Sequence, residues 1–120
     1  MGGYISLTLG LAIVTVVAFL MASASKRGTL DRNGAIGLRT RNTLKSDQAW
    51  HAGHQAAAPY LLAAGIVGTV GVIFAAAFPI VGVADAAEPA SLLIPGIALA
   101  IQVSVLLWST RVADRATLDA

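Results

Sequence analysis

The chain has 120 residues, enough for one compact unit; 57% of them are hydrophobic and only 12% are charged. Soluble domains carry about 25% charged residues, so half of that share indicates a protein of the lipid bilayer. The chain has no cysteine, which excludes disulfides and thiolate metal sites, and its formal net charge of +2 argues against nucleic-acid binding.

The first predicted element is a membrane-spanning helix within residues 1–25, a stretch without any charge. Two further uncharged runs cover residues 55–84 and 89–110. A helix needs about 20 apolar residues to cross the hydrocarbon, where it satisfies its own backbone hydrogen bonds. The sequence therefore predicts an all-α membrane protein. Its three transmembrane helices are expected at about 4–24, 56–79 and 90–110.

Positive charge predicts the orientation of these helices. The loop 26–55 carries six of the eight Lys and Arg residues, Arg111 and Arg115 follow the third helix, and the loop 81–89 carries neither Lys nor Arg. Basic loops stay on the cytoplasmic side. We therefore expect the loop 26–55 and the C-terminus in the cytoplasm, with the N-terminus and the loop 81–89 outside. Absence of positive charge before the first run favours a retained anchor over a cleaved signal peptide.

The loop 26–55 is where specific chemistry is expected. Cationic and hydroxyl donors precede the second helix: Arg39, Thr40, Arg41, Thr43, Lys45 and Ser46. Such donors ahead of a helix N-terminus can bind an anionic headgroup or an acidic protein partner. The simpler alternative is that the basic residues only anchor the loop on the cytoplasmic side. Ser46 or Asp47 offers the N-cap of the second helix, and Trp50 stands where an interfacial aromatic residue belongs.

Asp47, His51 and His54 are the candidate metal ligands, because their spacing places them on one face of a helix. Two histidines and a carboxylate can bind zinc, but no second cluster completes the shell. We therefore predict no metal site and no cofactor. A pH-sensitive headgroup contact is the other interpretation, since histidine titrates near neutrality. No nucleophile, base and orienting group are grouped as catalysis requires, so we expect no enzyme and no catalytic residue.

Small residues mark a packing face on the second helix, where Gly68 and Gly71 lie between Ala64 and Ala75 at helical spacing. Such a face lets another helix approach closely, either one of this chain or one of another chain. Gln102 is the strongly polar side chain near the middle of the third helix. We expect it to hydrogen-bond across helices, an interaction that contributes about 0.6 to 2 kcal/mol in membranes.

A spacing within the loop resembles the signature of the SdpI family. It reads Asn33…Gly37-Leu38-Arg39-Thr40…Thr43-Leu44…Ser46-Asp47…Trp50…His54. The resemblance implies a multi-pass protein of the bacterial inner (plasma) membrane. For the family's namesake, it implies protection against a membrane-active toxin and capture of a transcriptional repressor at the cytoplasmic face. The namesake type has spans beyond the signature unit, whereas three are expected here.

These observations lead to two hypotheses of function. The first is a non-enzymatic, SdpI-like protein of toxin immunity or signalling that acts through the loop 26–55, with the signature residues as its binding site. The alternative is a small accessory subunit of a larger membrane complex, in which Gly68, Gly71 and Gln102 dock the partner. Membrane lipids and either a protein partner or a second copy of the chain are the expected partners.

Overall fold

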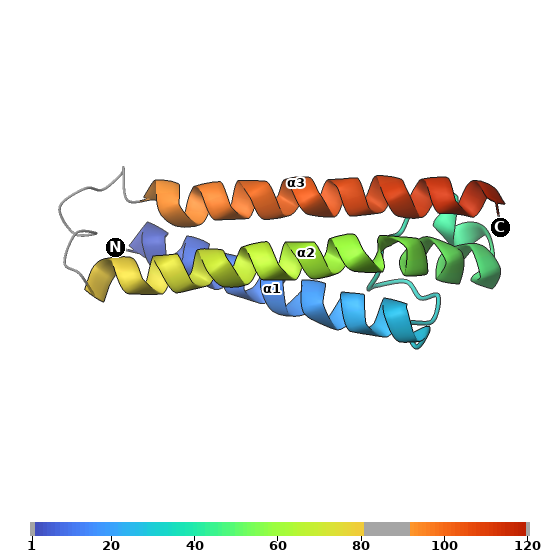
Figure 1. Cartoon of the computed structure of the whole chain (residues 1–120), viewed down its shortest axis with the longest axis horizontal. Helices are drawn as coiled ribbons and strands as arrows, with labels where there is room; N and C mark the ends of the chain where they lie inside the picture. Colours follow the sequence, from blue (N-terminus) through green and yellow to red (C-terminus); the bar gives the residue numbers. More distant parts are fainter. Residues whose placement is uncertain (1, 81–91, 120) are drawn as a thin grey trace.

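A computed structural model describes residues 2–80 and 92–119, which form three long helices and two short 3-10 turns. The helices are α1 (Gly2–Arg27), α2 (Asp47–Ile80) and α3 (Leu93–Ala116), and the turns are η1 (Thr43–Lys45) and η4 (Thr117–Asp119). All three helices are long and apolar enough to cross a membrane. They lie along the long axis of a molecule measuring 53 × 21 × 21 Å (Figure 1). The prediction of an all-α protein with three spanning helices is thus confirmed.

Helix α2 is longer than the predicted second span. At 1.5 Å per residue its 34 residues extend about 51 Å, whereas the hydrocarbon core is about 30 Å thick. Its first turns therefore project beyond the apolar stretch that begins at Ala56. Ser46 caps this end, because its Oγ accepts the Ala49 N–H at 3.0 Å. The predicted loop 81–89 lies outside the described residues, and the sidedness of the two ends stays a prediction from loop charge.

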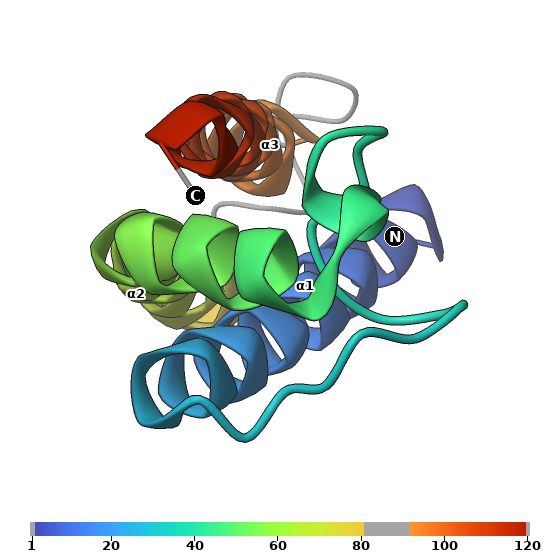
Figure 2. The same cartoon turned by 90° about the vertical axis from the view of Figure 1, so that its right-hand side faces the viewer.

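Helix α2 packs against both α1 and α3, and the end-on view of Figure 2 shows it between them. The small-residue face makes this close approach possible. A Cβ at Gly71 would lie 2.5 Å from the Cβ of Ala98 on α3 and 3.0 Å from Leu11 Cδ2 on α1. At Gly68 a Cβ would overlap both Thr15 of α1 and Gln102 of α3. The face therefore lies between the other two helices of the same chain.

Buried hydrogen bonds tie the three helices together within the bundle. The Gln102 side-chain amide donates to Thr15 Oγ1 at 2.9 Å and to the Ala64 carbonyl at 3.1 Å, so one residue of α3 bonds both α1 and α2. Nearer the other end, the Tyr4 hydroxyl donates to the Ala75 carbonyl at 2.7 Å. Each bond gives a polar group a partner in a region where water is scarce.

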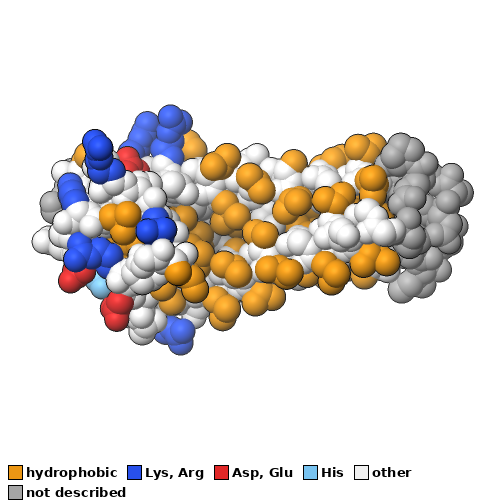
Figure 3. Space-filling model, turned by 180° about the vertical axis from the view of Figure 1, so that it is seen from behind, with side chains coloured by type: hydrophobic (Ala, Val, Ile, Leu, Met, Phe, Trp, Pro, Cys, Tyr) orange, Lys and Arg blue, Asp and Glu red, His pale blue; other side chains and the backbone are white. Residues whose placement is uncertain are grey.

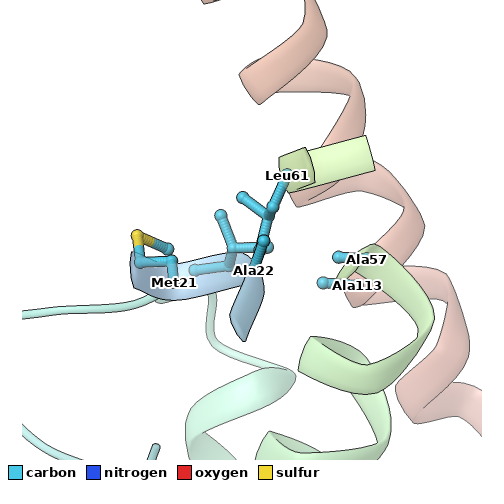
Figure 4. Close-up of a cluster of buried hydrophobic side chains, with 6 residues drawn as sticks. Met21, Ala22, Ala57, Leu61 and Ala113 are labelled. Carbon is cyan, nitrogen blue, oxygen red and sulfur yellow. The ribbon is translucent and has the colours of Figure 1, made fainter. Parts of the chain in front are cut away.

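A cluster of buried apolar side chains closes the end of the bundle where the charged residues lie. It joins Met21 and Ala22 of α1, Ala57 and Leu61 of α2, and Ala113 of α3 (Figure 4). Leu38 from the segment between α1 and α2 completes the cluster and is only 7% exposed. This segment is therefore packed onto the helices. Figure 3 shows charged side chains gathered at this end and apolar side chains along the helices, as expected of a surface that faces lipid.

Candidate functional site

The segment that carries the first part of the signature, residues 28–46, folds over the charged end of the bundle, and we call it the basic loop. It begins at Gly28, whose φ of +70° ends α1 in the left-handed conformation that glycine favours. The N–H of Thr29 then donates to the Ala24 carbonyl at 2.9 Å. Helix α1 is thus closed by a backbone cap, and the chain turns back toward α2.

Asn33 organises the first bend of the basic loop. Its Oδ1 accepts the N–H groups of Ala35 and Ile36 at 2.8 and 2.7 Å. Its Nδ2 donates to the carbonyls of Asp31 and Ile36, each at 2.9 Å. One side chain therefore supplies the partners of four backbone groups, which is the usual reason for asparagine in such turns. Asn33 shapes the loop and has no donor or acceptor left for a ligand in this arrangement.

Trp50 and His54, one turn apart on α2, form the surface on which the basic loop rests. The Trp50 indole N–H donates to the Leu30 carbonyl at 2.8 Å, and the two ring centroids lie 4.1 Å apart. Trp50 is fully buried within the protein, so its ring packs beneath the basic loop and is not exposed to lipid. Gly37 crosses these rings with a φ of +130°, and a Cβ there would lie 2.5 Å from Trp50 Cη2. Only glycine fits at this crossing.

His54 binds the backbone of both segments. Its Nδ1 donates to the Trp50 carbonyl at 2.7 Å, and its Nε2 accepts the Leu38 N–H at 2.9 Å. A carbonyl only accepts and an N–H only donates, so this geometry requires the neutral ring with its proton on Nδ1. Burial lowers the pKa of His54 below its ordinary value, the Trp50 bond opposes this shift, and the charge of His51 adds to it. His54 therefore holds the loop in its neutral form.

The second half of the basic loop is bound to the end of α3. The Thr40 hydroxyl donates to Asp114 Oδ1 at 2.7 Å, and Asn42 Nδ2 donates to Asp114 Oδ2 at 3.2 Å. These two hydrogen bonds lower the pKa of Asp114, the Thr40 bond most. Thr43, which is fully buried, donates to the Leu38 carbonyl at 2.7 Å and accepts the Thr40 N–H at 2.8 Å. The loop thus bridges α2 and α3.

Asp114 was missed in the sequence analysis. It is separated from Thr40 by 74 positions, so no local pattern could reveal the contact. The one available signal was its charge, because Asp114 lies between Arg111 and Arg115 in a segment interpreted only through its basic residues. A lone acid among basic residues at a helix end is a reason to look for a partner in another charged segment.

The candidate metal ligands do not converge. Asp47 pairs with Arg32, with 3.1 Å between Oδ1 and Nε, and the His51 Nε2 lies 3.9 Å from an oxygen of Asp31. Both ring nitrogens of His54 are already hydrogen-bonded. Across residues 2–80 and 92–119, no three His, Cys, Asp or Glu residues come together as a metal site would require. These three side chains instead contact residues of the basic loop.

Two basic residues of the loop lie on its exposed surface. Arg39 and Arg41 are exposed, while the hydroxyls of Thr40, Thr43 and Ser46 are engaged in the hydrogen bonds of the loop and the α2 cap. The folded loop therefore exposes two guanidinium groups. Such groups match the oxygens of carboxylates and phosphates.

The neutral state of His54 leads to a testable pH dependence. Because its pKa is lower in the docked loop than in a free chain, protonation favours release of the loop. We expect full docking above the ordinary histidine pKa of 6.5 and progressive loss as the pH falls through the lower pKa of docked His54. Acrylamide quenching of Trp50, measured in a Trp108→Phe chain from about pH 8 to about pH 5, should rise on acidification.

Two variants separate the histidines in this pH experiment. His51→Gln removes the neighbouring histidine and should keep the rise in quenching, whereas His54→Gln should remove it. Asp114 stays ionised throughout, because its pKa lies below the ordinary value of 3.8. A rise of equal size in the His54→Gln chain would assign the pH dependence to another group.

Comparison with known proteins identifies the part of the chain that carries the signature. The model of the SdpI/YfhL protein family matches residues 29–109, which include the basic loop from Thr29 onward, α2 and most of α3. No curated protein and no solved structure matches the chain.

Proposed function

The chain belongs to the SdpI/YfhL protein family, and on this premise we propose a non-enzymatic immunity or signalling protein of the bacterial inner membrane that acts through its basic loop. The observation that carries the proposal is the folded state of the loop. Its signature residues hold a defined shape against α2 and α3, and Arg39 and Arg41 project from that shape.

The cost of ordering the loop supports a binding role over a plain connection. Fixing the backbone of one residue costs about 1 to 2 kcal/mol, so a long ordered loop needs many compensating contacts. Here the buried rings of Trp50 and His54 and the hydroxyl of Thr43 supply them. A loop that only joined two helices and anchored them by charge would need neither the shape nor the contacts.

The position of the loop also links the membrane helices to the charged end of the bundle, which the charge of the loop predicts to face the cytoplasm. It is hydrogen-bonded to α2 through His54 and to α3 through Asp114. A toxin or lipid that shifted these helices against each other would therefore change the docking of the loop, and a partner bound to the loop would resist that shift. Such reciprocal coupling needs two states with different contacts, which the docked and released loop provide.

The proposal is tested by toxin challenge of a bacterial strain that lacks its own SdpI-family proteins and expresses this chain. We expect survival with the unaltered chain and at least tenfold lower survival with Arg39→Gln combined with Arg41→Gln, since interface arginines often carry much of a binding energy. The matched control is Arg111→Gln with Arg115→Gln, which removes the same charge from exposed positions on α3. Membrane levels of all three chains are compared by immunoblot.

Two results would contradict the proposal. One is no protection by the unaltered chain together with no partner held at its loop in a pull-down from membranes. The other is equal loss of protection in both double variants, since that would reflect total charge.

The accessory-subunit alternative has no specific observation in its favour. Its docking residues Gly68, Gly71 and Gln102 are occupied by contacts with α1 and α3 of the same chain. A partner would have to bind other surfaces. Stoichiometric co-purification of a larger membrane protein in mild detergent would support this alternative.

A further inference from the structure

A groove of about 680 Å³ opens between α1 and α2 at the charged end of the bundle. Its rim is polar, with Ser23 and Lys26 on α1 and Gln55 on α2, and its wall is apolar, with Phe19, Pro59 and Leu62. None of these residues belongs to the family signature or takes part in the hydrogen bonds that dock the basic loop. The groove is therefore a separate feature of the molecule, and a ligand bound in it would not depend on the proposed function.

The polar and apolar parts of the groove lie at different depths. Lys26 and Phe19 are seven residues apart on α1, and Gln55 and Leu62 are seven residues apart on α2. Seven residues are two helical turns, which place each pair on one face about 10 Å apart along the axis. Lys26 is the first charged residue after α1 has crossed the apolar region. The rim thus lies at headgroup level and the wall at the level of acyl chains.

The deep end of the groove is closed by an aromatic ring. A Cβ at Gly65 would lie 2.8 Å from Cδ1 of Phe19, so the ring packs directly on the backbone of α2. Because glycine stands there, the ring bridges the two helices. The groove above it has a floor and two apolar sides, unlike the general lipid-facing surface of a helix.

Among residues 2–80 and 92–119, the donors of the rim have no protein partners. The ion pairs of the described residues join Arg32 to Asp47 and His51 to Asp31, so the exposed Lys26 ammonium is in neither. The Gln55 amide and the Ser23 hydroxyl, both exposed, are likewise outside the hydrogen bonds of the described chain. A cation and two neutral donors around one opening match the oxygens of a phosphate group.

From these features we propose that the groove binds one phospholipid with an anionic headgroup. Its phosphate lies among Ser23, Lys26 and Gln55, and an acyl chain runs along Phe19 and Leu62. Basic pockets between transmembrane helices are suited to such headgroups. A second copy of the chain fits less well, because an apolar helix laid over the rim would bury the charge of Lys26.

Fluorescence quenching by brominated lipids tests this site. The probe is a tryptophan introduced by Phe19→Trp in a Trp108→Phe chain, so that the one native tryptophan left is the buried Trp50. The chain is reconstituted in phosphatidylcholine vesicles with either brominated phosphatidylglycerol or brominated phosphatidylcholine at equal mole fraction. We expect about fivefold preferential quenching by the anionic lipid, the effect of one lysine near an anionic headgroup. High salt should reduce the preference.

Three variants make the result specific. Lys26→Gln should abolish the preference for the anionic lipid, and Lys26→Arg should keep it. Arg111→Gln should also keep the preference, because Arg111 is an exposed cation of α3 that does not line the groove. Equal quenching by both lipids, or a preference unchanged in Lys26→Gln, would overturn the proposal. Such a result would mean that the quenching comes from ordinary lipid surrounding the protein. Quenching by neither lipid in a chain that purifies as a dimer would also overturn it and assign the groove to a second copy.

Discussion

Replacing Gly37 by alanine is expected to release the basic loop from α2. The backbone at Gly37 has a φ of +130°, and an added Cβ would lie 2.5 Å from Trp50 Cη2 and 3.0 Å from His54 Nε2. Backbone strain of this kind costs about 1 to 3 kcal/mol, and overpacking a filled site costs about as much again. We therefore expect docking to weaken by about 3 kcal/mol or more, which lowers hydrogen-exchange protection in residues 28–46 at least about 100-fold.

Gly34→Ala is the matched control for Gly37→Ala. Gly34 lies in the same loop, but its φ is not positive and an added Cβ would meet no atom within 4 Å. In the Gly34→Ala chain, hydrogen-exchange protection of residues 28–46 should remain close to that of the unaltered chain. In the Gly37→Ala chain, exchange within α1 and α3 should stay slow, since the bundle does not depend on the loop crossing. Equal protection in the two variants would mean that the crossing of Gly37 over Trp50 does not limit docking.

Replacing Gly68 by alanine is expected to destabilise the helix bundle at its centre. An added Cβ would overlap the Thr15 hydroxyl and the Gln102 amide, which are hydrogen-bonded to each other. The bond contributes about 0.6 to 2 kcal/mol in membranes, and overpacking adds about 1 to 3 kcal/mol. We expect the free energy of unfolding, measured in mixed micelles of dodecyl maltoside and dodecyl sulfate, to fall by about 2 to 4 kcal/mol.

Gly10→Ala and Gly96→Ala are matched controls on α1 and α3, because neither added Cβ meets an atom within 4 Å. Alanine favours helix over glycine by up to about 1 kcal/mol, so these variants should be neutral or slightly stabilised. Adding Thr15→Ala to the Gly68→Ala chain removes one of the overlapping groups and should restore part of the stability. A Gly68→Ala chain as stable as the two controls would mean that α1 and α3 do not meet at Gly68.

The helices and their packing face were predictable because the signals are local. Uncharged stretches long enough to span the bilayer predicted α1, α2 and α3, and the helical spacing of Gly68 and Gly71 predicted a face for close approach. Sequence could not decide which helix meets that face, since small residues accept any neighbour of suitable shape. The structure places both α1 and α3 there, joined by Gln102.

The sequence located the segment that resembles the family signature, but the contacts of its residues depend on segments far apart in the chain. Trp50 and His54 were grouped with the binding residues, and the structure buries both beneath the basic loop. A histidine near a membrane surface gives no local sign of whether its nitrogens face a ligand, a lipid or the backbone of another segment. The Leu38 N–H that occupies His54 is 16 positions away, and Asp114 is 74 positions from Thr40.

By itself, the amino-acid sequence determined the class of protein, the three helices and the segment that carries the family signature. These properties depend on hydrophobicity summed along short segments and on residue spacing, which need no knowledge of the fold. Only the tertiary structure decided which side chains of the basic loop are interior and which are outward. Burial and hydrogen bonding at Gly37, His54 and Asp114 arise when segments far apart in the chain meet, and that geometry exists only in the folded bundle.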